Sequence, residues 1–221
     1  MRKRLFCVKI RYMENTKAQK ILKELAALYP DAQPALEFGS PYELLVAVIL
    51  SAQCTDERVN KVTKVLFEKY NTPEKMLTLT QAELEKYIFS CGFYRNKAAH
   101  ILSASHDIVE KFDGNVPCTL DRLKTLAGVG QKTANVVYAV AFGGDAIAVD
   151  THVFRVSNRL GVAEGNTPAK VEAGLNAAFP KSEWSKAHHY LIYHGRRVCH
   201  SQKPDCVNCT LRDLCKFYNN K

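Results

Sequence analysis

The sequence predicts an all-α protein, and three observations support this prediction. Apolar residues recur at helical spacing through most of the chain. A serine or threonine followed three residues later by glutamate marks helix starts at Ser40 and Thr80. The best strand candidate, residues 146–149, is too short to nucleate a sheet alone. We therefore expect this apolar run to be a buried connector between helices.

The predicted helices follow one another with short connections. The first should end near Pro30, and the second begins with Pro41 at its first helical position. Residues 44–50 are apolar on all sides, which predicts a helix that is buried all round. Gly114 and Gly143 mark the ends of two later helices. The apolar positions that define the remaining pattern are Leu22, Leu25 and Leu28; Val59, Val62, Val65 and Leu66; Ala98, Ile101, Leu102, Ile108, Val109 and Phe112; Leu120, Leu123 and Leu126; and Ala134, Val137, Tyr138 and Ala141.

The net charge of +9 is unevenly distributed. Residues 1–12 contain five basic residues and no acid, so this basic N-terminal extension supplies more than half of the total. These residues are either an extension translated upstream of a true start at Met13 or a basic arm that binds phosphates. The sequence does not decide whether the extension is ordered. No apolar run approaches the roughly 20 residues that span a membrane. Lys9 interrupts the signal-like start, so we expect neither a membrane partner nor secretion.

A glycine turn separates two predicted helices at residues 126–134. Gly128 and Gly130 flank Val129, which can turn inward and pin the helices together. The second helix then presents its free N-terminal N–H groups, beside the small residue Thr133, as a phosphate site. Such a site would bind DNA with little regard to sequence. The alternative is a tight helical hairpin without a ligand.

Lys132 and Asp150 are candidate catalytic residues. Lys132 falls in the first turn of the second hairpin helix, where the helix dipole and partial burial would favour the neutral, nucleophilic amine. Asp150 follows the apolar connector and should cap the next helix while facing a cleft. A lysine with a nearby carboxylate could attack a sugar C1′ and form a Schiff base. The alternatives are a surface lysine that contacts phosphate and an aspartate that only caps a helix.

Four of the eight cysteines lie in the last 23 residues, with the spacing C-x6-C-x2-C-x5-C. Crowded thiolates predict a metal centre in a reducing compartment, and the spacing alone allows zinc or a [4Fe–4S] cluster. Residues 200–205 would form a loop that places Lys203 against a phosphate, unless this lysine is simply solvated. These four candidate ligands are Cys199, Cys206, Cys209 and Cys215. The scattered thiols, expected to be buried or inert, are Cys7, Cys54, Cys91 and Cys118.

The hairpin, the Val-Asp-Thr-His segment eighteen residues after its lysine, and the cysteine spacing together resemble the endonuclease III family of helix-hairpin-helix DNA glycosylases. The resemblance covers about residues 17–217. It implies a DNA glycosylase and abasic-site lyase of base excision repair, which removes oxidised pyrimidines through a lysine Schiff base. The expected partner is double-stranded DNA with oxidised pyrimidines or abasic sites, bound by a monomer in the bacterial cytoplasm.

The resemblance also implies residue roles. Lys132 would be the nucleophile, Asp150 the catalytic carboxylate, and the four clustered cysteines the ligands of a [4Fe–4S] cluster. The hairpin, with Gly128, Val129, Gly130 and Thr133, would bind DNA. Within residues 51–56, Gln53 is similar to the residue that fills the gap left by an extruded nucleotide. Phe93 stands in a segment similar to the family's wedge loop, where bacterial relatives usually have leucine; ordinary core packing is its alternative.

The implied fold has two helical domains flanking a DNA-binding cleft. Residues 34–144 would form a six-helix domain with the hairpin, and residues 13–33 would join 145–221 in a domain that carries the cluster loop. A competing enzymatic interpretation is a monofunctional glycosylase of the adenine-mismatch type, which generally lacks the lysine and has a further C-terminal domain. A non-catalytic helix-hairpin-helix DNA-binding protein would have no reason to keep both Lys132 and Asp150. An electron carrier is disfavoured, because ferredoxin cysteines follow a tighter spacing.

Overall fold

The computed structural model describes residues 16–220, so the basic extension of residues 1–12 lies outside the described part of the chain. Throughout residues 16–220 the regular structure is helical and no strand is formed, which confirms the all-α prediction. The helices of the first half are α1 (Lys17–Leu28), α2 (Pro41–Ser51), α3 (Asp56–Phe67), α4 (Pro73–Met76), α5 (Gln81–Ile88), α6 (Tyr94–Phe112) and α7 (Leu120–Leu123). Those of the second half are α8 (Gln131–Phe142), α9 (Thr151–Leu160), α10 (Pro168–Ala178), η1 (Lys181–Glu183), α11 (Trp184–Arg197), η2 (Arg212–Leu214) and α12 (Lys216–Asn219).

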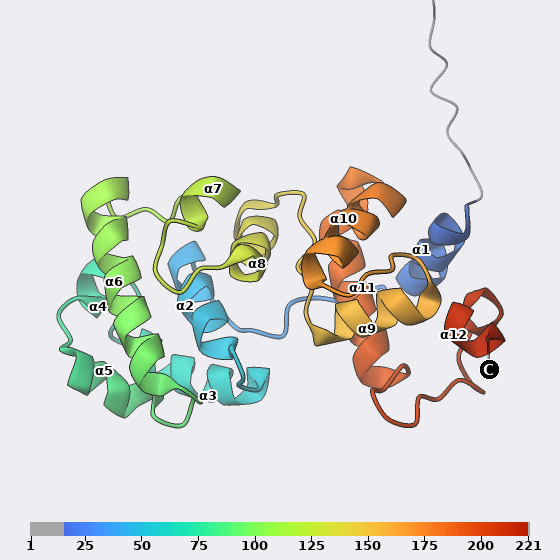
Figure 1. Ribbon diagram of the computed structural model, residues 1–221. Coiled ribbons are helices and arrows are strands. Elements are labelled where there is room, and N and C mark those ends of the chain that lie inside the picture. Colours follow the sequence, from blue (N-terminus) through green and yellow to red (C-terminus); the bar gives the residue numbers. More distant parts are fainter. Residues whose placement is uncertain (1–15, 221) are drawn as a thin grey trace, which may run out of the picture.

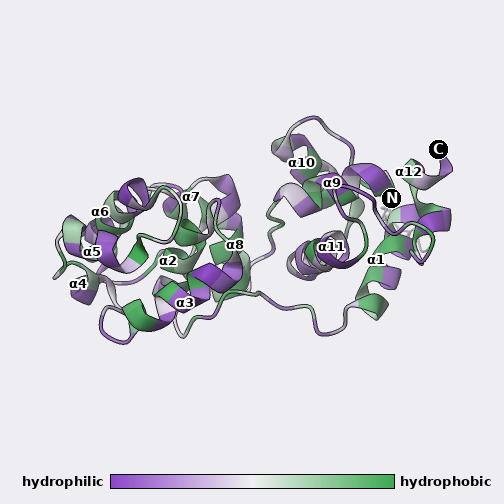
Figure 2. Cartoon of the chain, turned by 90° about the horizontal axis from the view of Figure 1, so that it is seen from below, coloured by the Kyte–Doolittle hydropathy of each residue, from purple (hydrophilic) through white to green (hydrophobic). Residues whose placement is uncertain are grey.

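The helices form two lobes, each around its own hydrophobic core (Figure 1). The first lobe contains α2 to α8, and the second contains α9 to α12 together with α1, which returns to pack against α11. Figure 2 shows the same lobes from below, joined by two stretches of chain. We propose that they correspond to the two domains expected from the sequence. Among the helices of residues 16–220, none is both long and apolar enough to cross a membrane.

Helix α2 is the centre of the first lobe. Its residues from Leu44 to Leu50 are all buried, as the uninterrupted apolar run predicted. It contacts α3, α6 and α8, so nearly every side of the helix meets another element. Because the fully buried helix cannot shift without disturbing all three neighbours, it fixes the position of the loop that follows Ser51.

Two local predictions need correction. Thr80 and Glu83 form the complete reciprocal capping box, but at Ser40 only half of it is present. Ser40 caps the N–H of Glu43, whereas the Glu43 side chain turns back to the N–H of Gly39. The predicted helix through Leu126 is also shorter than expected, because α7 is a single turn and Leu126 lies buried in the connection after it.

The connector of residues 146–149 is buried and forms neither helix nor strand, as predicted. Its carbonyl groups cannot reach water, so they need partners within the protein. Asn135 of α8 donates to Ile147 O at 2.8 Å, and Nδ1 of His188 on α11 lies 2.8 Å from Ala148 O. Since a carbonyl oxygen only accepts, Nδ1 of His188 carries the proton. The connector is thereby fastened to both lobes.

His188 and His189 are neighbouring histidines that α11 places against the connector and the cleft, with ring centroids 4.9 Å apart. Burial lowers the pKa of His188; the Asp150 carboxylate opposes this effect and the Lys132 ammonium adds to it. Burial, with a smaller contribution from His188, lowers the pKa of His189 to about 3. Both imidazoles are therefore neutral in the folded protein at neutral pH, whereas an unfolded histidine takes up a proton near pH 6.5.

We expect the free energy of unfolding to fall as the pH drops below about 6.5, because the unfolded chain then binds protons that the folded His188 and His189 refuse. The slope is at most about 1.4 kcal/mol per pH unit for each histidine. His189→Leu should remove one such contribution, so its stability should change less than that of the wild type between pH 7.5 and pH 5.5. Urea unfolding at both pH values measures the free energy of unfolding. An equal change between the two pH values in both proteins would contradict this prediction.

Candidate active site between two helical lobes

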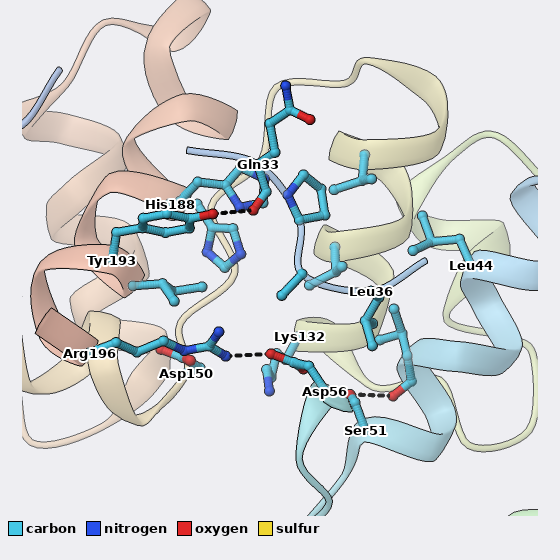
Figure 3. Close-up of a pocket in the computed structure, with 17 residues that line it drawn as sticks. Gln33, Leu36, Leu44, Ser51, Asp56, Lys132, Asp150, His188, Tyr193 and Arg196 are labelled. Atoms are coloured by element: carbon cyan, nitrogen blue, oxygen red, sulfur yellow. Dashed lines mark hydrogen bonds and ion pairs between the residues drawn. The ribbon is translucent and has the colours of Figure 1, made fainter. Parts of the chain in front are cut away.

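One pocket lies between the lobes, and it contains both predicted catalytic residues (Figure 3). Lys132 reaches it from α8 in the first lobe, and Asp150 reaches it from the start of α9 in the second. Its apolar wall includes Leu44 and Val48 of α2. The other lining residues are Gln33, Pro34, Ala35, Leu36, Ser51, Asp56, Val136, Val140, His188, His189, Ile192, Tyr193 and Arg196. A charged pair thus faces an opening with one apolar wall.

The hairpin before α8 has the geometry that its sequence predicted. Gly128 has a φ of +76°, and a Cβ atom there would come within 2.9 Å of His100 Cβ, so this position requires glycine. Val129 is buried between the helices. Gly130 is different: it is extended, and a Cβ there would meet nothing within 4 Å. The lack of a side chain at Gly130 therefore leaves the surface in front of the first turn of α8 open. Thr133 in that turn is half-buried.

Lys132 is the second residue of α8, as predicted, but it is exposed and not partly buried as expected. The N-terminal end of the α8 dipole is unfavourable for its positive charge. Exposure leaves the amine accessible to a large ligand that enters between the lobes. Its expected position in the first turn is confirmed, whereas the expected burial is wrong.

Asp150 caps α9, and its Oδ1 accepts the Val153 N–H at 2.7 Å. The cap holds the half-buried carboxylate at the N-terminal end of α9. Asp150, Lys132 and the buried His188 all line the same pocket. The capping role is therefore compatible with a place in the pocket.

Polar links also join the two lobes, and no pattern in the sequence indicates them. Arg196 of α11 donates to Asp56 Oδ2 at 2.6 Å, which bridges the second lobe to the first (Figure 3). Asn135 of α8 donates to Glu172 Oε1 of α10 at 2.9 Å. The Arg196–Asp56 pair is partly exposed, so its contribution is at most about 1 kcal/mol. These residues are far apart in sequence, and no local pattern marks them as partners.

Gln53 and Phe93 lie next to each other at one end of the first lobe, outside the lining of the pocket. Both have left-handed backbone conformations, with φ of 51° and 56°, and such residues cost of order 1–3 kcal/mol each. A Cβ atom on Gly92 would lie 3.4 Å from Gln53 O, so the two turns are in contact. Phe93 is 65% exposed, which excludes the alternative that it packs in the core.

The four clustered cysteines line one cavity in the second lobe: Cys199, Cys206, Cys209 and Cys215. Arg159 donates to Cys199 Sγ at 3.5 Å and also holds the next loop through His200 O and Ser201 O. In the part of the chain that the structure describes, no three side chains of ligand type are grouped as a single metal ion would require. Lys203 is exposed at the tip of this loop, with a φ of 49°.

Comparison with known proteins agrees with this arrangement. The family model described as HhH-GPD superfamily base excision DNA repair protein matches residues 46–181. The chain is 50% identical over 196 residues to endonuclease III of Bacillus subtilis, which covers 88% of this chain and 90% of that protein. It is 48% identical over 200 residues to endonuclease III of Synechocystis, covering 90% and 91% respectively. A solved structure of a trapped endonuclease III–DNA covalent intermediate has a TM-score of 0.88 and 49% identity, and the match covers 93% of this chain and 98% of that one. The chain therefore belongs to the HhH-GPD superfamily of base excision DNA repair proteins and, within it, to the endonuclease III family.

Proposed function

We propose that this protein is a bifunctional DNA glycosylase and abasic-site lyase, which removes oxidised pyrimidines from duplex DNA and nicks abasic sites. The observation that supports it best is the shared pocket of Lys132 and Asp150, which the chain supplies from opposite lobes. Lys132 is the nucleophile in this proposal, and Asp150 is the carboxylate that manages protons and charge.

The hairpin provides a grip on DNA that does not depend on sequence. The first N–H groups of α8 have no partners within the helix, and the open surface at Gly130 leaves room for a phosphate. Gly128, Val129, Gly130 and Thr133 therefore serve backbone binding and not base reading. The exposed Lys203 supplies a second phosphate contact from the loop after Cys199.

The target nucleotide must leave the duplex before its sugar can reach Lys132, and flipping costs a few kcal/mol. Gln53 and Phe93 reduce this barrier by entering the stack, with Gln53 in the vacated position and Phe93 as the wedge. Oxidised pyrimidines have lost aromaticity and stack poorly. Extrusion therefore costs less for these bases, which is one source of selectivity.

The chemistry proceeds through a covalent bond to the sugar. The neutral Lys132 amine gives its electron pair to C1′ as the bond from C1′ to the base breaks, and the base leaves with that bond's electrons and takes up a proton. Asp150 accepts the proton that the attacking nitrogen loses. Ring opening then breaks the bond from C1′ to the ring oxygen: the nitrogen electron pair forms the C=N double bond of the Schiff base, and the ring oxygen keeps the electrons of the broken bond and takes the proton that Asp150 accepted. Loss of a C2′ proton and departure of the 3′ phosphate then nick the strand. Water finally hydrolyses the Schiff base and frees Lys132.

We also propose that Cys199, Cys206, Cys209 and Cys215 hold a [4Fe–4S] cluster. Their thiols line one cavity, and membership of the endonuclease III family favours the cluster over zinc. Arg159 offsets the negative charge of the thiolates through its contact with Cys199. When bound, the cluster joins four points near the end of the chain and holds the loop that carries Lys203.

Lys132→Ala should abolish covalent trapping on abasic-site DNA by borohydride, because among the described residues Lys132 is the only lysine that lines the pocket. The wild type should form the adduct, and so should Lys23→Ala, which removes an exposed lysine of α1. Gel electrophoresis of the trapped complex measures this. Equal trapping by Lys132→Ala and the wild type would remove Lys132 from this role.

Asp150→Asn separates the cap from the chemistry. Asparagine caps a helix as well as aspartate does, so the free energy of unfolding should change by less than about 0.5 kcal/mol. The loss of a proton acceptor should lower the rate of base excision by about 10²- to 10⁴-fold. Single-turnover excision of thymine glycol, measured beside urea unfolding, tests both expectations. A variant that is stable and fully active would leave Asp150 with a structural role alone.

Anaerobically purified protein should contain about four irons and four acid-labile sulfides per chain, as a [4Fe–4S] cluster requires. Cys206→Ser removes one ligand and should lower both contents, whereas Cys118→Ser, at an exposed cysteine of the first lobe, should leave them unchanged. Metal and sulfide analysis decides the matter. One zinc per chain without sulfide would exclude the cluster.

A further inference from the structure

Lys97 is a buried lysine that the catalytic proposal does not use. It lies near the start of α6 and is only 4% exposed, although lysine is rarely buried. Burial lowers the pKa of its ammonium group. A charged group held in the interior at such a cost needs strong hydrogen bonds, so its partners indicate what it does.

Those partners belong to the turn that carries Gln53. Lys97 Nζ donates to Leu50 O at 2.8 Å and to Ala52 O at 2.6 Å. Leu50 is in the last turn of α2, where carbonyl groups lack helical partners and a cation is favourable. Ala52 immediately precedes Gln53, so the ammonium group fixes the backbone from which Gln53 projects in its left-handed conformation.

The backbone of Lys97 belongs equally to the turn of Phe93. The Lys97 N–H donates to Phe93 O at 3.1 Å, which forms the first helical hydrogen bond of α6. The end of α2 and the start of α6 lie together at the lower end of the first lobe (Figure 1). Lys97 therefore contacts the turns of both exposed residues. Its ammonium group binds the turn of Gln53, and its backbone N–H binds the turn of Phe93.

Further observations support a single unit. Gly92 lies against Gln53 O, and burial together with the neighbouring Cys54 thiol raises the pKa of the Cys91 thiol. The turn of Gln53 is already bound to the end of α2, because the Cys54 N–H donates to Ser51 O at 3.1 Å. Lys97 adds hydrogen bonds that join the start of α6 to the same end of α2.

We propose that Lys97 is a positioning residue that locks Gln53 and Phe93 into one rigid element for entry into the DNA stack. The inference rests on the proposed function, because it assumes that these two side chains enter the duplex. Lys97 touches neither substrate nor the reacting atoms, and it acts on the opening of the duplex and not on the chemistry at C1′.

The test compares one abasic-site oligonucleotide as a duplex and as a single strand, which has no base pairs to open. Lys97→Met keeps an unbranched side chain that is one atom shorter, and it removes the donors. Its nicking rate on the duplex should fall about 10- to 100-fold, because small misplacements of positioning groups have effects of this size. Its rate on the single strand should stay within about twofold of the wild type. Lys69→Met, at an exposed lysine of the same lobe, should match the wild type on both.

A second measurement shows whether Lys97 acts through its two neighbours. In a Gln53→Ala, Phe93→Ala background, adding Lys97→Met should change the duplex rate by less than about twofold, since the elements it positions are already gone. A further loss equal to that in the wild-type background would overturn the inference. So would parallel losses on duplex and single strand.

Folding is checked on the same proteins. Thermal unfolding establishes whether Lys97→Met is folded at the assay temperature; if it is not, Lys97→Leu, which also lacks donors, is assayed in the same way. If neither variant folds, Lys97 is only a structural residue and the inference fails. Failure of the proposed function is distinguishable, because then the wild type itself would nick neither substrate. A wild type that nicks and a Lys97→Met variant with unchanged duplex activity would overturn this inference alone.

Discussion

The buried connector of residues 146–149 is the constraint on which the arrangement of the pocket depends. It leaves α8 in one lobe and delivers Asp150 to the start of α9 in the other. Because its carbonyls are hidden from water, they must be matched inside the protein, and Asn135 and His188 do this from opposite sides. The middle of the connector is thus fixed from both lobes, which restricts the movement of Asp150 relative to Lys132.

Two helices begin at the pocket, and their dipoles act differently on the two charged residues. Asp150 is held at the favourable end of α9, where its cap also fixes the side chain. Lys132 lies in the N-terminal turn of α8, where a positive charge is unfavourable and a negatively charged group such as phosphate is favourable. One kind of local structure is therefore favourable for the carboxylate and unfavourable for the ammonium charge, and in the proposed function it also supplies the anion site for DNA. Buried, neutral His188 adds no charge of its own to this balance.

Much of this could be predicted from sequence, because the relevant signals are local. The helical class, the all-round burial of α2, the turn at Gly128 and the cap at Asp150 each depend on a few neighbouring residues. The half-formed box at Ser40 was not predictable, since the choice of Glu43 between two adjacent N–H groups depends on the path of the chain before the helix. Contacts between residues far apart in the sequence could not be predicted either, because they depend on the path of the folded chain. The Arg196–Asp56 bridge spans 140 positions, and the bonds of Lys97 span more than forty. The prediction that Lys132 is partly buried was wrong, because its side of α8 borders the open pocket between the lobes and is not covered by another helix.

The bridge between Arg196 and Asp56 has a consequence for the behaviour of the protein in salt. It is one of the polar links between the lobes, and both of its side chains are reached by solvent. Dissolved ions weaken such an exposed pair, and they also compete with the protein for DNA phosphates. Ionic strength therefore acts on two interactions at once: it weakens the binding of nucleic acid and eases the separation of the two lobes that border the pocket.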